Sequence, residues 1–133
     1  GNRNIVRLLM ASGFDPTDKD NQGNNALHWA AKGQNPEIVL DLLASNPNLI
    51  NDRCIAWKSP LHLAAAWGNI GVVQGLLLGG AQVRATDDFG MTPLHYAAKQ
   101  GDIQIVEMIL RDRGVDVNAE DHLGRTPLYI ACE

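Results

Sequence analysis

The sequence lacks the features that mark several large classes of protein. No apolar run approaches the 18 or so residues that a membrane-spanning helix needs, and no signal peptide opens the chain. Cysteine is scarce, and Cys54 and Cys132 stand about two repeats apart, so we expect no disulfide and an intracellular, cytoplasmic location, with the nucleus as the alternative. A nucleophile elbow, a phosphate-binding loop and an HExxH sequence are all missing. We therefore expect this chain to carry no catalysis, no cofactor and no metal.

What the chain does contain is a repeat with a nearly fixed period. Four similar segments occupy residues 24–31, 58–65, 91–98 and 125–132. Their central leucines are spaced 34, 33 and 34 residues apart, and they are Leu27, Leu61, Leu94 and Leu128. A period in this range indicates a stack of small structural units.

Residues 92–97 read T-P-L-H-Y-A, which matches the T-P-L-H-x-A signature of ankyrin repeats. The chain resembles the ankyrin-repeat family over nearly its whole length. The resemblance implies an all-α fold, an α-solenoid of helix-turn-helix units joined by β-hairpin-like fingers. We expect one such domain over 1–133, divided into a partial repeat (1–19), three repeats (20–53, 54–86 and 87–120) and a second partial repeat (121–133). The chain has no initiator Met and opens and closes partway through a unit, so we expect it to be a fragment of a longer protein.

Local signals place two short helices in each unit. Ser59-Pro60, Thr92-Pro93 and Thr126-Pro127 each offer a hydroxyl at the N-cap and Pro at the first helical position. The second helices are expected to start at N-caps Asn2, Asn35, Asn69 and Asp102. Their apolar stripes, expected to face the core, are Ile5, Val6, Leu9 and Met10; Ile38, Val39, Leu42 and Leu43; Val72, Val73, Leu76 and Leu77; and Ile105, Val106, Ile109 and Leu110. Gly13, Asn46, Gly80 and Gly114 are expected to end these helices in a left-handed conformation.

His28, His62 and His95 occupy the same position in successive units. One His per repeat cannot supply the cluster of ligands that zinc requires, and Tyr129 fills the position in the last unit. A ring on the first helical turn can bond the backbone or the cap hydroxyl. We therefore expect a structural role for these histidines.

In ankyrin repeats the variable, exposed positions lie at the finger tips and along the first helices, so the resemblance places a candidate surface there. Carried over to this chain, these positions hold six of the eleven Lys and Arg residues, so an acidic chain has a comparatively basic inner edge. Trp57 also replaces the glycine that turns the other fingers, Gly23, Gly90 and Gly124. Exposed apolar residues flanked by cations are typical of binding hot spots. The predicted partner-binding residues are Ile55, Trp57, Lys58, Trp67, Phe89, Met91, Lys99, Leu123 and Arg125.

These features predict a protein–protein interaction scaffold whose partner has an apolar patch and acidic surroundings, with no membrane partner. Two alternatives stay open: the array is a targeting or regulatory module of a larger enzyme, channel or effector, or Trp57 and Trp67 only cover neighbouring structure. Nucleic acid is the weaker partner, because six spread cations in a chain of net charge −4 track phosphates poorly.

Overall fold

Residues 2–133 of the computed structural model form a stack of short helices with no strand among them. The elements in chain order are α1 (Arg3–Ala11), α2 (Ala26–Lys32), α3 (Pro36–Ser45), the 3₁₀ helix η1 (Pro47–Asn51), α4 (Pro60–Trp67), α5 (Ile70–Leu78), α6 (Pro93–Gln100), α7 (Ile103–Leu110) and α8 (Pro127–Cys132).

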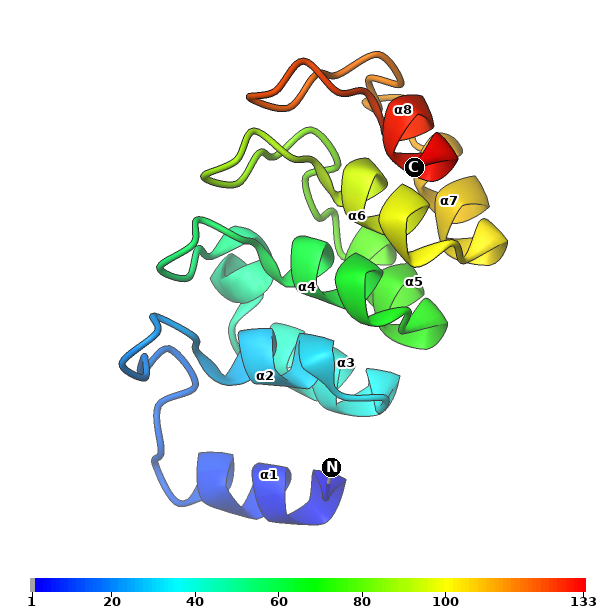
Figure 1. Ribbon diagram of the computed structural model, residues 1–133. Coiled ribbons are helices and arrows are strands. Elements are labelled where there is room, and N and C mark those ends of the chain that lie inside the picture. Colours follow the sequence, from blue (N-terminus) through cyan, green and yellow to red (C-terminus); the bar gives the residue numbers. More distant parts are fainter. Residues whose placement is uncertain (1) are drawn as a thin grey trace.

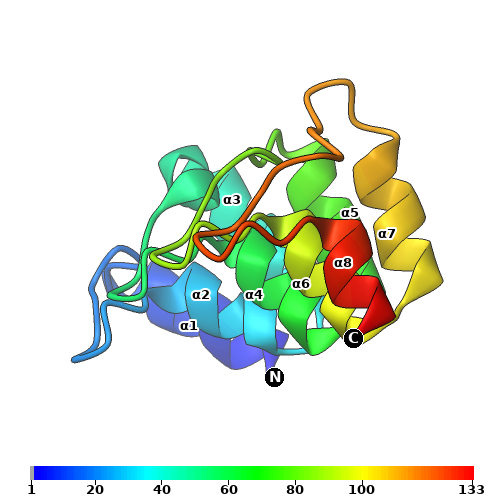
Figure 2. The same ribbon diagram turned by 45° about the horizontal axis from the view of Figure 1, so that its top comes forward.

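The helices lie in two layers that run the length of the stack (Figure 1). The first helices, α2, α4, α6 and α8, pack in order on one another, and the second helices, α1, α3, α5 and α7, do the same behind them (Figure 2). Four long loops, the fingers, project from one side of the stack. The turns of the first to fourth fingers are residues 20–24, 54–58, 87–91 and 121–125. The arrangement confirms the expected all-α solenoid.

The helix starts follow the predicted signals with one exception. Pro stands at the first position of α4, α6 and α8, and the side chain of Asn35 accepts a hydrogen bond from the Glu37 N–H. Asn69, predicted to cap α5, does not do so. Its buried amide instead donates to the carbonyl oxygen of Ala31 at 2.9 Å, because that carbonyl in the preceding unit is its available partner.

The core forms between the layers and confirms most of the predicted stripes. Leu27, Leu61, Leu76, Ile105 and Ile109 are fully buried. Three predicted core residues lie exposed instead, namely Ile5, Leu9 and Leu110. They belong to the outermost second helices, α1 and α7, each of which has a second-helix neighbour on one side only among residues 2–133.

Helix α1 joins the stack through charge as well as through apolar contact. Arg3 and Arg7 both donate to the Asp41 carboxylate on α3, with Nε to Oδ2 distances of 2.6 and 2.9 Å, and Arg3 also pairs with Glu37. The bonds from Arg3 and then Arg7 hold the pKa of Asp41 well below its usual range.

The connectors after the second helices differ in part from expectation. Gly13 and Gly80 take the predicted left-handed conformation, but Gly114 does not, and Asn46 has φ −146°. The chain after Asn46 turns into η1, an element that the sequence analysis missed. The 3₁₀ helix buries Leu49 in the core, so the chain reaches the core here through η1 and needs no left-handed residue at Asn46.

One buried histidine joins each unit to the next. The backbone N–H of the N-cap residue donates to Nδ1 of the ring three residues later, and Nε2 lies within hydrogen-bond distance of a carbonyl in the following finger. In His62 and His95, whose N-cap residues carry hydroxyls, Nε2 therefore carries the ring hydrogen and donates to that carbonyl. The N-cap, histidine and finger residues are Asn25, His28 and Lys58, then Ser59, His62 and Met91, then Thr92, His95 and Arg125. The Nε2 to oxygen distances are 3.2, 3.0 and 2.9 Å.

The bridges through His62 and His95 require a neutral ring, since a protonated Nδ1 cannot accept the N-cap hydrogen. Burial lowers the pKa of His62 from 6.5 to about 4, and burial also lowers the pKa of His28. The structural role predicted for these rings therefore has a definite form: they tie a helix start to the next finger.

We expect the stack to lose stability as the pH falls from 6.5 to 4. The unfolded chain protonates His62 near pH 6.5 and the folded chain only near pH 4, so this ring's contribution is complete above pH 6.5 and is lost toward pH 4. The loss from His62 alone is roughly 3 kcal/mol at about 1.4 kcal/mol per pKa unit. Urea denaturation at a series of pH values measures it.

The control is His62→Gln, which cannot titrate. It should be less stable at pH 7, because the bridge is impaired, but its stability should fall less steeply between pH 6.5 and 5. Equal slopes for the two proteins would contradict the assignment.

Candidate functional site

The fingers share one backbone turn, in which the first residue donates its N–H to the carbonyl of the fifth. In three fingers that first residue is an aspartate whose Oδ1 accepts from the N–H groups two and four residues later. In the third finger, for example, Asp87 Oδ1 accepts from Phe89 and Met91, each at 2.9 Å. Asp20 and Asp121 do the same in the first and fourth fingers. The fingers are therefore rigid loops that hold their tip side chains in fixed positions.

The second finger departs from this design at two positions. Cys54 replaces the aspartate, and Trp57 occupies the glycine position with φ 57°, the only non-glycine residue with positive φ among residues 2–133. Arg53 braces the loop instead, donating from Nη1 to the carbonyls of Trp57 and Thr86 at 2.7 and 3.0 Å. Residues held in a strained backbone conformation are often found at functional sites, which makes Trp57 a candidate for a functional role.

Between the third and fourth fingers and α6 lies a hollow of about 430 Å³. Its lining brings together six of the nine predicted partner-binding residues: Lys58, Phe89, Met91, Lys99, Leu123 and Arg125. Tyr96, Asp121 and His122 complete it. The side chains of Phe89 and Leu123 are 61% and 76% exposed, and Lys99 is also exposed. The hollow is therefore open, with an apolar rim and two lysines beside it.

Two predicted residues of the hollow behave differently from expectation. Met91, expected to be exposed, is only 8% exposed, because its carbonyl and N–H are fixed by His62 and Asp87 and its side chain packs inward. Arg125 is not a free cation: its guanidinium donates to the buried Asp121 carboxylate at 2.9 Å and lies 3.5 Å from Glu133. Lys58 and Lys99 have no carboxylate within ion-pair distance among residues 2–133.

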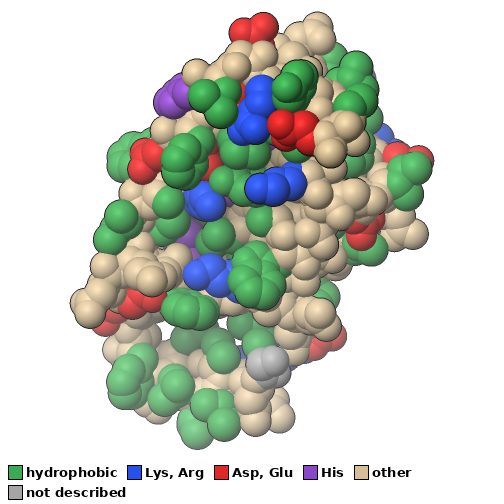
Figure 3. All heavy atoms as spheres, in the orientation of Figure 1, with side chains coloured by type: hydrophobic (Ala, Val, Ile, Leu, Met, Phe, Trp, Pro, Cys, Tyr) green, Lys and Arg blue, Asp and Glu red, His purple; other side chains and the backbone are tan. Residues whose placement is uncertain are grey.

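The other three predicted residues do not line this hollow. Ile55 and Trp57 are exposed on the second finger, and Trp67 is 60% exposed at the far end of α4. Both tryptophans therefore expose more than half of their surface to solvent. Figure 3 shows basic side chains in a row down the first-helix side of the stack, with hydrophobic side chains on both sides.

Two aromatic residues on this surface were missed by the sequence analysis. Trp29 Nε1–H donates to Asp20 at 2.9 Å, and the Tyr96 hydroxyl donates to Asp87 at 2.6 Å. Burial and then the Asp87 carboxylate raise the pKa of Tyr96. The signal was available: each aromatic stands nine residues after a finger aspartate, whereas Cys54 is followed at that distance by Leu63.

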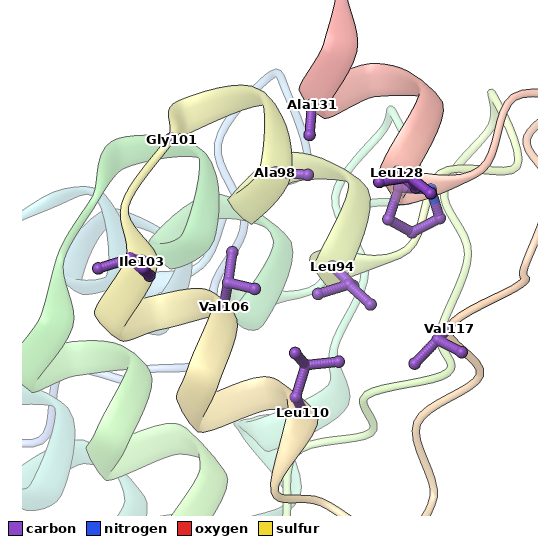
Figure 4. Close-up of a pocket in the computed structure, with 10 residues that line it drawn as sticks. Leu94, Ala98, Gly101, Ile103, Val106, Leu110, Val117, Leu128 and Ala131 are labelled. Atoms are coloured by element: carbon purple, nitrogen blue, oxygen red, sulfur yellow. The ribbon is translucent and has the colours of Figure 1, made fainter.

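A second hollow of about 430 Å³ lies between α6, α7 and α8 and is almost wholly apolar (Figure 4). Its lining includes Val106 and Leu110, which stand in register with Val73 and Leu77 of the core. Helix α7 covers the corresponding face of α5. This hollow therefore lies on the face of α7 that corresponds to the face of α5 covered by α7, and it shares no lining residue with the hollow beside the third and fourth fingers.

Within residues 2–133, no three His, Cys, Asp or Glu side chains converge as a metal site would require. Over the same residues, every helix is too short or too polar to cross a bilayer.

Comparison with known proteins decides the family. The model of "Ankyrin repeats (3 copies)" matches residues 1–87 and again 61–133. The chain belongs to the ankyrin-repeat family. A fowlpox virus ankyrin repeat protein is 35% identical to it over 81% of this chain and 74% of its own length. Ankyrin repeats are protein–protein interaction modules, and this chain is such a module.

Other ankyrin-repeat relatives are far longer than this chain. The human transient receptor potential cation channel subfamily A member 1 is 38% identical over 86% of the chain, which spans 10% of that protein. The chicken nuclear factor NF-kappa-B p105 subunit is 37% identical over 80% of the chain and 11% of its own length. The Arabidopsis thaliana E3 ubiquitin-protein ligase KEG is 35% identical over 93% of the chain and 8% of its own length. The chain thus spans about a tenth of these relatives.

We expect Trp57→Gly to raise the free energy of unfolding by about 0.5 to 1 kcal/mol. A left-handed conformation costs an L-residue about 1–2 kcal/mol, and the greater freedom of glycine in the unfolded chain returns about half of that. Urea denaturation at pH 7 measures the change.

Gly90→Ala is the matched control at the same position of the next finger. An added Cβ there would lie 2.6 Å from Cδ2 of His122, so stability should fall by more than about 1 kcal/mol. Trp57→Gly with lowered stability would show that the Trp57 ring packs favourably enough to outweigh its backbone strain.

Proposed function

We propose that the fingers and first helices of this chain bind a protein partner that presents an apolar patch in acidic surroundings. The observation that carries the proposal is the hollow beside α6, where exposed Phe89 and Leu123 stand next to Lys58 and Lys99. Neither lysine has a carboxylate in ion-pair distance within residues 2–133, so their charge is available to a partner. Apolar anchors with flanking cations supply affinity and orientation respectively.

The mechanism is pre-organisation. The aspartate caps, the histidine bridges and the Arg53 brace hold the finger tips before a partner arrives. Binding then orders few groups, so a small number of apolar contacts is enough for useful affinity. In this proposal the chain contributes recognition and no catalysis of its own, and it acts inside the cell.

A second candidate is that the array is the targeting or regulatory part of a larger protein. It is favoured by the small share of the relatives that the chain spans, since those relatives include a cation channel and a ubiquitin ligase by name. Both candidate functions use the same binding surface. They differ in whether binding serves only to hold the partner or also to target or regulate further domains of a larger protein.

We expect Trp67→Ala combined with Phe89→Ala to weaken partner binding by about 30-fold or more, the effect of losing at least 2 kcal/mol of hot-spot contact. Both side chains are exposed, so folding should be unaffected. The partner would be recovered from an extract of the source cells, and its affinity for each purified variant measured by calorimetry.

Leu78→Ala is the control, because Leu78 is 82% exposed on α5, in the opposite layer. Partners kept by Leu78→Ala and lost by the double variant support the proposal. An unchanged affinity in the double variant would remove it.

A further inference from the structure

Two lysines on the first-helix side are fixed over aromatic rings instead of being paired with carboxylates. Lys32 Nζ lies 4.2 Å from the centre of the Trp29 ring, and Lys58 Nζ lies 4.9 Å from the centre of the Tyr96 ring. Such cation–π contacts hold an ammonium in place without neutralising it. We call Lys32 with Trp29 the first lysine site, and Lys58 with Tyr96 the second.

The aromatic ring of each site is itself fixed by a finger. Trp29 donates to Asp20 and Tyr96 donates to Asp87, while the other oxygen of each carboxylate caps its finger turn. The carboxylates therefore serve the fold and form no ion pair with Lys32 or Lys58. Lys99 lines the same hollow as Tyr96 and adds a second free cation there.

The aromatic rings of the two sites stand in the same register, two units apart, while Lys32 lies at the end of α2 and Lys58 in the finger before α4. Trp29 is in the unit of α2 and Tyr96 in the unit of α6, and the unit between has buried Leu63 at this position. Neighbouring packed helices lie about 8–10 Å apart, which puts the sites about 16–20 Å apart. An extended peptide covers that distance in about five or six residues, at roughly 3.3 Å each.

We propose that the two lysine sites bind two acidic groups of one extended segment of the protein partner, separated by about five or six residues. This inference rests on the proposed function and deepens it, because it states the spacing of charge that the partner must carry. The unit between them has the buried Leu63 in place of an aromatic ring, so no third aromatic–lysine pair lies between the two sites. Apolar side chains between the acidic groups meet the exposed surface of α4, where Trp67 lies.

Synthetic peptides test the spacing directly. The probe is an eight-residue peptide with two Glu-Glu pairs whose centres are six residues apart, and the comparison peptide has the same composition with its four glutamates contiguous. Titrated into the isotopically labelled 133-residue chain and followed by NMR, the spaced peptide should bind at least about fivefold more tightly and should shift the Trp29 indole N–H signal.

Charge reversal tests the two sites. Lys32→Glu and Lys58→Glu should each lower the affinity for the spaced peptide by about fivefold or more, since a repulsive contact replaces an attractive one. In the variant with both changes, a peptide with lysines at the four glutamate positions should bind more tightly than the glutamate peptide does. Arg111→Glu makes the same charge change at the exposed end of α7, and it should leave binding within about twofold.

Three results would overturn the inference: equal affinity for the two glutamate peptides, an equal effect of Arg111→Glu, or tighter binding of oligothymidine with the same lysine dependence. The last would identify a nucleic-acid surface. If the peptides fail while Trp67→Ala with Phe89→Ala still abolishes capture of the natural partner, the proposed function stands and only the charge spacing is wrong.

Discussion

One buried imidazole in each of the three complete repeats ties neighbouring units of this structure together. The α-helices are six to ten residues long, too short to be stable alone, and the fingers contain no strand. The His62 ring accepts a hydrogen bond from the start of its own helix and donates one to the next finger, so one side chain fixes both. Burial between units lowers the pKa of His62 and so favours its neutral ring, which can accept at Nδ1 and donate at Nε2. The packing of one unit on the next and the position of the finger between them therefore depend on the same side chain.

The recognition surface follows from that constraint. With the fingers fixed, an aspartate at the start of a finger can cap its own loop and still orient an aromatic ring nine residues later, and that ring can carry a lysine. The surface cations are thus placed by neutral groups and keep their charge for a ligand. The second finger has given up its aspartate and its glycine, and it presents Trp57 at the cost of backbone strain. The second finger therefore combines an exposed aromatic side chain with a strained backbone, which the other three fingers avoid by having glycine at this position.

Features that depend on residue type and repeat spacing could be predicted, and features that depend on side-chain contacts in the fold could not. The period, the helix starts, the structural role of His62 and the glycine-like position of Trp57 follow from residue type and spacing alone. Met91 and Arg125 were misjudged because one packs beneath the hollow and the other is paired with a buried carboxylate. Trp29 and Tyr96 were missed although each stands nine residues after a finger aspartate, because only the fold shows that this spacing brings the ring and the carboxylate together. Which residues touch the partner remains a prediction.

Native-state hydrogen exchange tests the account most directly, through the backbone amides of Asn25, Ser59 and Thr92. These N–H groups donate to the buried histidine rings, so the account predicts that they exchange only when the stack itself opens, with free energies close to that of global unfolding. Amides that exchange as fast as those of an exposed loop, in a chain that is otherwise folded, would show that the bridges do not hold the fingers. The rigid recognition surface would then have no physical basis.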